Sequence, residues 1–281
     1  MSVDLACPTC STKLRESEKD CPSCGSFCWF PNVRKAENPV ERAALDASYD
    51  IALSNAKARG VDSVLASYTA ALADSVAVVC QSLDQVKTLL SSDRPVFISF
   101  HQQRSSKGRR PEDTPIETQR VATDARVFPF YFEEIKFAAL SLDGKGASSY
   151  GGCSLVLRSV AIQKRTSVFW ENSVDFCNRV CAIQSDPIPA GYRAPWASRA
   201  KLATAKGEPL LGSGTSPTEF SRILLEGDRF VEVHIYGPFN RESFDRLLLP
   251  KPTKKDEKAM VAAIREVISN DGLPIKVEEY L

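Results

Sequence analysis

Residues 7–25 read CPTCSTKLRESEKDCPSCG, and this stretch decides the fold of the amino-terminal end. Two Cys-Pro-x-Cys pairs, Cys7/Cys10 and Cys21/Cys24, are separated by ten residues. A Cys-x-x-Cys turn places two thiolates on one side of a metal ion, and two such turns supply the four soft ligands of a tetrahedral Zn²⁺ site. Gly25 permits the positive backbone φ that is common after such a turn. The sequence therefore predicts a closed, structural zinc site.

The alternatives for these cysteines are a redox pair or chance spacing. Two matched pairs favour metal ligation, and the stretch resembles the zinc-ribbon family, which carries both pairs in this form. The resemblance covers residues 1–30. It implies a fold and no single function, since zinc ribbons bind nucleic acids, dock proteins or staple a chain end. The aromatic residues Phe27, Trp29 and Phe30 are expected to form the packing surface of the ribbon.

The composition of the 281 residues is that of an ordinary globular protein, with 25% charged and 43% apolar residues. The net charge of +1 gives no overall attraction to nucleic acid or acidic membranes. The longest apolar runs are too short to span a bilayer, and the amino terminus lacks a secretory pattern. Nine cysteines without a secretion signal favour a reducing compartment, so we expect a cytoplasmic protein with no membrane partner.

The chain is expected to divide into the ribbon (1–30), a helical segment (38–92) and an α+β domain (93–281). The residue pattern predicts helices over 38–60, 61–73, 82–90, 114–126, 174–183, 196–206, 216–225 and 254–269, and strands over 75–80, 96–101, 135–142, 149–157, 166–170, 230–236, 245–249 and 274–279. Strands and helices are interspersed without regular β–α alternation. This favours an α+β fold with a mainly antiparallel sheet over a doubly wound one.

Two strand pairings are predicted from short connections. Residues 143–146, Asp-Gly-Lys-Gly, have the composition of a hairpin turn and are expected to join strand 135–142 to strand 149–157. Strand 245–249 is expected to pair with strand 230–236.

Several catalytic motifs are missing from the sequence. Two histidines exclude a histidine-rich metal centre, and there is no G-x-S-x-G elbow, P-loop or dinucleotide-binding G-x-G-x-x-G. Cys80, Cys153, Cys177 and Cys181 stand in apolar surroundings, and Cys177 and Cys181, which share a helix face, are expected in the core.

Three residues are unusual for their positions. His101 ends the strand at 96–100, Tyr150 follows the glycine-rich residues 144–146, and Glu232 interrupts an apolar strand. A carboxylate inside a strand is costly when buried without a partner, so such a residue faces solvent or a working cleft.

Taken in order, residues 95–250 resemble the ADP-ribosyltransferase fold, which has a histidine or arginine on an early strand, a glycine-rich turn with an aromatic element, and a glutamate on a late strand. The resemblance implies an NAD-dependent transferase in which Glu232 bonds the nicotinamide-ribose hydroxyl and stabilises an oxocarbenium-like transition state. It implies that His101 bonds a ribose hydroxyl and Tyr150 stacks on nicotinamide. Arg104, in the basic loop 102–113, would meet the phosphates of NAD. The partner would be a macromolecular acceptor, in the setting of a toxin or phage-defence effector.

The same residues have structural interpretations. Glu232 and His234 share one strand face, which can be solvated while Val231, Val233 and Ile235 fill the core. His101 can be an exposed strand end. The competing function is a non-catalytic module in which the ribbon and residues 104–110 bind nucleic acid or protein.

Overall fold

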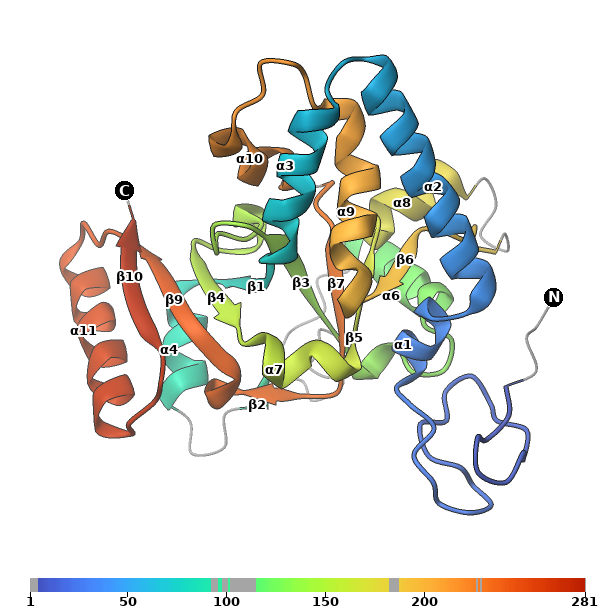
Figure 1. The fold of residues 1–281 in the computed structure, drawn as a ribbon. Coiled ribbons are helices and arrows are strands. Elements are labelled where there is room, and N and C mark those ends of the chain that lie inside the picture. Colours follow the sequence, from blue (N-terminus) through green and yellow to red (C-terminus); the bar gives the residue numbers. More distant parts are fainter. Residues whose placement is uncertain are drawn as a thin grey trace.

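The computed structural model describes residues 5–91, 96–97, 101, 115–181, 187–225, 227 and 229–280. Its architecture is the α+β fold that the sequence predicts, with helices packed against a mainly antiparallel sheet of eight strands. The cysteine ribbon projects from one end of this body, next to helix α1 (Pro31–Ala36) (Figure 1).

The sheet brings together strands from distant parts of the chain. Its order is β10 (Lys276–Tyr280), β9 (Phe244–Pro250), β4 (Cys153–Leu157), β1 (Val76–Gln81), β3 (Ile135–Ser141), β7 (Glu232–Tyr236), β5 (Thr166–Phe169) and β6 (Arg193–Pro195). Neighbouring strands are antiparallel except β10 and β9, which are parallel. A second, small sheet pairs β2 (Val96–Phe97) with β8 (Phe239–Asn240).

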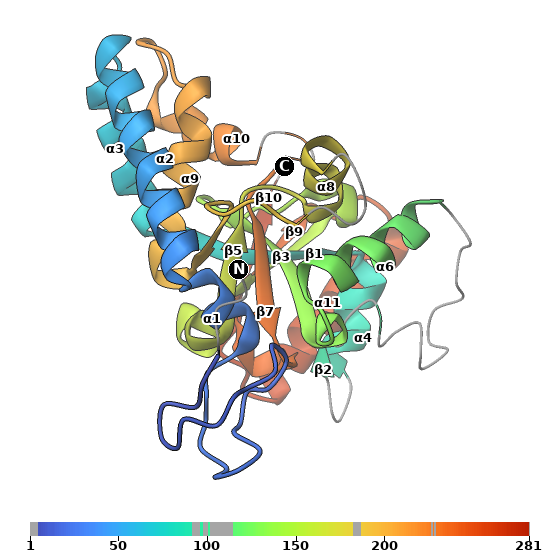
Figure 2. The same cartoon turned by 90° about the vertical axis from the view of Figure 1, so that its right-hand side faces the viewer.

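Helices lie on both faces of the sheet (Figure 2). The helices are α2 (Pro39–Ala58), α3 (Asp62–Ala73), α4 (Leu83–Ser91), α6 (Pro115–Val127), α7 (Ser159–Ile162), α8 (Ser173–Val180), α9 (Arg199–Gly207), α10 (Phe220–Leu224) and α11 (Lys255–Asn270). The main core joins α2, α3 and α9 to one face. A second core joins the end of α6 and the α8 helix to the opposite face, around Phe128, Phe169 and Phe176.

The amino-terminal helices begin and end where their capping residues predict. The side chain of Asn38 accepts a hydrogen bond from the backbone N–H of Val40, and Pro39 occupies the first turn of α2. Gly60, with φ of 66°, follows the end of that helix. Strand β1, which follows α3, lies between β3 and β4, so residues 38–92 supply a central strand of the sheet.

Both predicted strand pairings are wrong. Strands β3 and β4 exist, but β1 lies between them, so residues 143–146 cross over β1 instead of closing a hairpin. Gly146 lies against β1 so closely that a Cβ there would be 2.5 Å from the Cys80 sulfur. Strand β9 pairs with β4 and β10, whereas β7 pairs with β3 and β5. A turn sequence reports local chain reversal and carries no information about a strand inserted from an earlier segment.

Gly151 allows the chain to pass close to β1, which yields a stability prediction. Its φ is 151°, and an added Cβ would lie 2.2 Å from the carbonyl carbon of Gln81. At the adjacent Gly152 a Cβ would meet only Pro250, at 3.7 Å. We expect Gly151→Ala to lower the free energy of unfolding by about 3 kcal/mol, measured by denaturant titration, because backbone would have to move. Gly152→Ala is the control, and an equal loss in both variants would contradict this explanation.

Candidate functional site

The four ribbon cysteines converge as the sequence predicts. The Sγ atoms of Cys7, Cys10, Cys21 and Cys24 all lie within 4.8 Å of one another. The Cys7–Cys24 and Cys10–Cys21 sulfur separations are 3.7 and 3.5 Å. Four sulfurs at Zn–S distances of about 2.3 Å in a tetrahedron are about 3.8 Å apart. The donor set and its spacing therefore fit a metal ion such as zinc.

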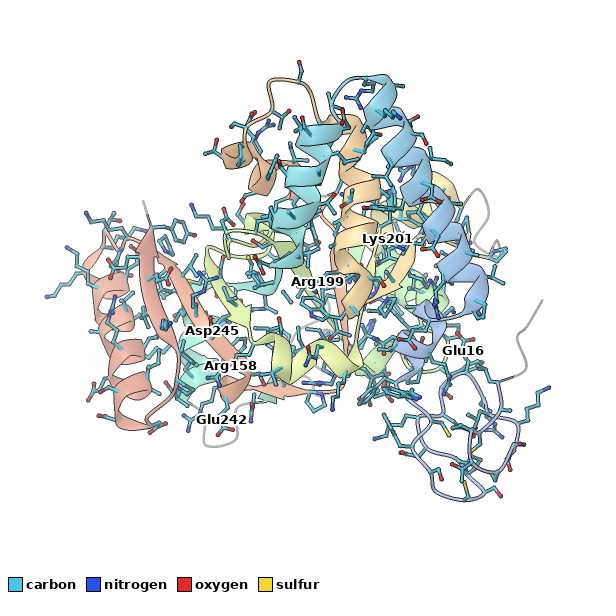
Figure 3. The ribbon with its side chains drawn as sticks, viewed as in Figure 1. Glu16, Arg158, Arg199, Lys201, Glu242 and Asp245 are labelled. Carbon is cyan, nitrogen blue, oxygen red and sulfur yellow. The ribbon has the colours of Figure 1, made fainter. Side chains whose placement is uncertain are left out.

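The ribbon is attached to the body by Arg34 of α1. Its guanidinium donates hydrogen bonds to the carbonyl oxygens of Glu18 and Cys28, each at 2.8 Å, and to those of two further ribbon residues, Arg15 and Glu16. Lys35 adds an ion pair with the Glu16 carboxylate at 2.6 Å. Figure 3 labels Glu16 near the junction of the ribbon and α1. One short helix thus holds several carbonyl groups of the metal-binding loops.

Part of the expected ribbon packing surface is solvent-exposed. Phe27 and Trp29 are 47% and 55% exposed, and their ring centroids are 5.9 Å apart. Phe30 instead faces the body, 5.4 Å from the ring of Tyr236. Of the predicted packing surface, Phe30 alone of the three aromatics packs against the body, and the interior of the ribbon is filled by Cys7, Leu14, Cys21 and Cys28.

Glu232 is the first residue of β7 and is buried, with 2% of its surface exposed. Its Oε1 accepts a hydrogen bond from Arg120 of α6 at 3.2 Å. Its Oε2 lies 2.8 Å from Nε2 of His234 and accepts the backbone N–H of Ser173 at 3.0 Å. Ser173 is the first residue of α8, so the carboxylate also lies at the positive end of a helix dipole.

These partners keep Glu232 ionised. Burial alone would raise the pKa of its carboxyl group, but the charge of Arg120 and the hydrogen bonds from His234 and Ser173 outweigh burial and lower the pKa to about 2. The pKa of Arg120 is raised, because the attraction of Glu232 and Asp124 exceeds the effect of burial, with a smaller contribution from Tyr150.

The network extends from Glu232 to His101. Arg120 donates through Nε to Oδ2 of Asp124, one helical turn further along α6, at 3.1 Å. The same Asp124 oxygen lies 2.8 Å from Nε2 of His101. His101 is 6% exposed and Asp124 is fully buried. The interpretation of His101 as an exposed strand end is therefore wrong, because a charged partner holds the imidazole inside the protein.

Tyr150 lies at the rim of this network. It sits in a single turn of 3₁₀ helix, Ser148–Tyr150, before β4, and is 54% exposed. Its hydroxyl accepts a hydrogen bond from Nδ2 of Asn172 at 2.9 Å, and Asn172 caps the helix whose first N–H binds Glu232. The structure thus connects His101, Tyr150 and Glu232 through Arg120 and the start of α8.

The face of β7 that carries Glu232 and His234 is not solvated. His234 is 2% exposed, with its ring 4.7 Å from that of Phe128 and 5.4 Å from that of Phe137. Val233 and Ile235 face the other core, as predicted. Both faces of β7 are buried because helices lie on both sides of the sheet. The polar and the apolar residues of this strand therefore face two different buried cores.

Other predicted site residues fall outside this network. Arg104 and the rest of loop 102–113 lie outside the described residues, so their predicted phosphate contact stays a prediction. Cys177 and Cys181 are buried, as predicted, and Cys80 and Cys153 are buried as well. Burial, followed by the proximity of Cys181, raises the pKa of Cys177 to about 12, which keeps this thiol protonated and unreactive.

Arg120, Asp124 and Ser173 belong to the network although no sequence pattern marks them as site residues. Arg120 and Asp124 are spaced i, i+4 on a helix, a pattern that usually marks a surface ion pair. Asn172-Ser173 is an ordinary helix start. Only the position of Glu232 opposite these groups gives them their role.

Comparison with known proteins found neither a protein-family model that matches the chain nor a curated protein similar to it. The resemblance to ADP-ribosyltransferases therefore rests on the residues above alone. Among the described residues, the helices are all too short or too polar to cross a membrane.

The geometry of the cysteines predicts metal binding that depends on each ligand. We expect about one metal ion per chain by atomic emission and loss of that ion in Cys10→Ser. Cys80→Ser, which changes a buried thiol outside the cluster, is the control and should retain the ion. Folded wild-type protein prepared without metal would contradict the assignment.

The lowered pKa of Glu232 predicts an acid-dependent stability. Because the folded carboxyl binds its proton less readily than the unfolded one, its contribution is present above pH 4.5, its ordinary value, and is lost as the pH falls to about 2. The contribution is on the order of 3 kcal/mol. We expect unfolding free energies measured from pH 5 to pH 2 to fall less steeply in Glu232→Gln than in the wild type. Equal slopes would mean that folding does not lower the pKa of Glu232.

Proposed function

We propose that this chain is an NAD-consuming enzyme of the ADP-ribosyltransferase type, with Glu232 as its acidic residue. The observation that carries the proposal is the meeting of His101, Tyr150 and Glu232 in one network around Arg120. These residues come from segments far apart in the sequence and were named from sequence motifs alone. They nevertheless lie in one hydrogen-bonded network.

The proposed chemistry needs a permanent anion next to the reacting ribose. The bond between the nicotinamide nitrogen and the ribose C1′ breaks, and its electron pair leaves with nicotinamide. A nucleophile on the acceptor then bonds to C1′ and gives up its proton. Positive charge develops on the ribose, and an ionised Glu232 stabilises it through a ribose hydroxyl or directly. A carboxyl with a pKa of about 2 is charged throughout the physiological range.

Tyr150 and His101 have distinct proposed roles. Tyr150 presents a half-exposed ring at the rim of the network, held by Asn172, and can stack on the planar nicotinamide. His101 is assigned the ribose-hydroxyl contact by the resemblance, and its ring also fixes Asp124. Asp124 in turn orients Arg120, so His101 acts on Glu232 through two charged groups.

Substrate contact requires a rearrangement of Arg120. Its guanidinium covers Oε1 of Glu232, and the carboxylate is 2% exposed. The Arg120 side chain is 15% exposed, so it forms the outer side of this ion pair. We propose that Arg120 turns toward a phosphate of NAD when the dinucleotide binds, which exchanges one anionic partner for another and frees Oε1.

The cysteine site is proposed to hold Zn²⁺ as a structural ion. Four cysteines fill a tetrahedral shell and leave no position for a substrate. The ribbon would then serve recognition of the macromolecular acceptor, since its exposed Phe27 and Trp29 offer an apolar contact area.

A second candidate function is a non-catalytic binding module, and the same exposed aromatic pair favours it. Here the ribbon binds nucleic acid or protein, and the Glu232 network is only a structural element. Trp29→Ala should then abolish binding to the target, whereas Glu232→Gln should leave binding unchanged.

The test of the proposed function is nicotinamide release from NAD. We expect the purified chain to release nicotinamide and Glu232→Gln to reduce the rate by about 100-fold or more, because the developing charge loses its counter-ion. Glu208→Gln is the matched control. Glu208 is equally buried and pairs with Arg59 at 2.7 Å, away from the network.

Thermal unfolding of both variants separates lost chemistry from lost folding. If Glu232→Gln stays folded and keeps its activity, the assignment of Glu232 is wrong. If the wild type releases no nicotinamide with or without nucleic acid or protein acceptors, and NAD does not shift its melting temperature, the enzyme proposal fails and the binding module is favoured.

A further inference from the structure

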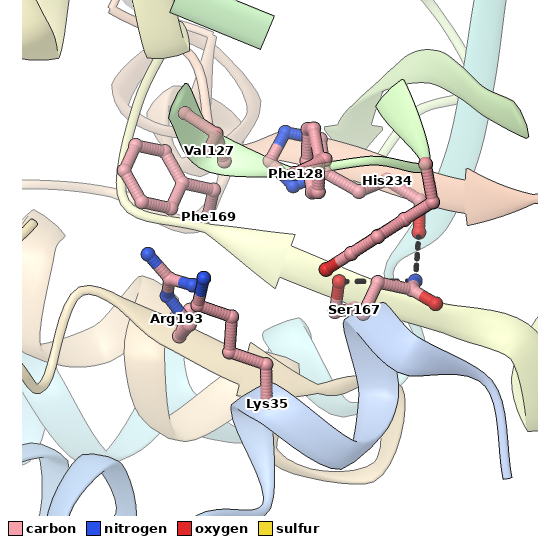
Figure 4. A pocket seen from close by; sticks show the side chains of 9 residues that line it. Lys35, Val127, Phe128, Ser167, Phe169, Arg193 and His234 are labelled. Carbon is pink, nitrogen blue, oxygen red and sulfur yellow. Dashed lines mark hydrogen bonds between the residues drawn. The ribbon is translucent and has the colours of Figure 1, made fainter. Parts of the chain in front are cut away.

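A small cavity lies between α1 and the face of the sheet that carries His234 (Figure 4). Its walls come from α1, β5, β6, β7 and the residues around the end of α6. The space open to the centre of a water molecule is about 10 Å³. One water molecule needs about this much room, and any larger ligand needs more.

Three buried side chains on the wall have polar atoms without hydrogen-bond partners in the described part of the chain. They are Oδ1 of Asn32, the hydroxyl of Tyr131 and Nε of Arg193. The residues are 2%, 3% and 5% exposed. Buried polar groups are almost always hydrogen-bonded, and three such atoms on one cavity indicate a shared ligand.

The orientation of Asn32 is fixed by chemistry. Its Nδ2 donates to the carbonyl oxygens of Arg165 and His234 at 3.1 and 3.0 Å, and contacts the Ser167 hydroxyl at 3.2 Å. Two carbonyl acceptors require an N–H donor at this position, so the carbonyl oxygen of the amide is the atom that remains. The ligand must therefore donate a hydrogen bond to Asn32.

The cationic side chains at the cavity have carboxylate counter-ions. Lys35 pairs with Glu16 at 2.6 Å, and Nε of Arg193 lies 3.2 Å from Oε1 of Glu41, although not in hydrogen-bonding alignment. Figure 4 shows Lys35 and Arg193 on the opposite side of the cavity from His234. Paired cations attract an anion weakly, and a halide could not donate to Asn32.

We propose that this cavity binds one structural water molecule, which donates to Asn32 and bridges it to Tyr131 and Arg193. A water molecule can donate two hydrogen bonds and accept two. It can therefore donate to Asn32 Oδ1, accept from Arg193 Nε, and either donate to or accept from the Tyr131 hydroxyl. The bridge joins α1 to strand β6 and to the connection before β3. It therefore belongs to the contact that holds the ribbon-bearing helix on the sheet.

Tyr131→Phe tests the bridge by the sign of its effect. If a water molecule satisfies the hydroxyl, its removal costs one hydrogen bond, and we expect the unfolding equilibrium constant in the full chain to rise about fivefold. If the hydroxyl has no partner, removal of an unsatisfied buried group should lower that constant. Tyr236→Phe, on the neighbouring half-buried ring, is the control and should change it less than twofold.

A crystal structure of the full chain gives an independent test. We expect one water-sized density peak within hydrogen-bond distance of both Asn32 Oδ1 and the Tyr131 hydroxyl. A crystal soaked in bromide should show no anomalous signal there. Absence of the peak, a bromide signal in the cavity, or a stabilised Tyr131→Phe would each overturn the proposal.

Discussion

The ion pair between Arg120 and Glu232 joins the two parts of the second core. A carboxylate taken out of water costs several kcal/mol unless its lone pairs and charge are matched. Here Arg120 comes from α6, His234 from β7 itself and the Ser173 amide from the start of α8. The packing of α6 and α8 on this face of the sheet is therefore coupled to the charge of one residue. Removal of either partner would take away the main counter-charge of a buried ion, which is more destabilising than the loss of an ordinary contact.

Helix α1 connects that core to the metal-binding loops. Asn32 binds the backbone carbonyls of Arg165, just before β5, and of His234 in β7. Arg34, two residues later, binds carbonyl groups of the ribbon. The His234 carbonyl that accepts from Asn32 belongs to the residue whose ring holds Glu232. Helix α1 thus binds the ribbon through Arg34 and the strand of the Glu232 network through Asn32. Loss of the metal would free the loops that Arg34 holds, and the disturbance would reach β7 through a six-residue helix.

Sequence patterns predicted what depends on neighbouring residues and failed where distant segments meet. The spacing of Cys7, Cys10, Cys21 and Cys24 is enough to predict the candidate metal site, because all four cysteines lie on two adjacent turns. Asn38 marks the start of a helix through its side-chain cap, and Gly60 marks its end through its positive φ. The position of β1 between β3 and β4, in contrast, is a non-local pairing that no turn residue encodes. Arg120 and Asp124 look like a surface pair in sequence, and only the strand opposite them makes them part of a site.

Glu232 is a charged residue at a buried position. Residues of β7 face two buried cores in turn, so an apolar residue, like the neighbouring Val233, would fit the position of Glu232. An apolar residue there would usually be as stable as a buried ion pair or more so, which makes the retained charge weak evidence for stability. Arg120 has a second carboxylate partner in Asp124, so the guanidinium can leave Glu232 without losing all compensation. The ring of His234 and the Ser173 amide would still contact the carboxylate through its Oε2. The proposed enzyme function would use this charge, because a cationic transition state requires an anion beside it.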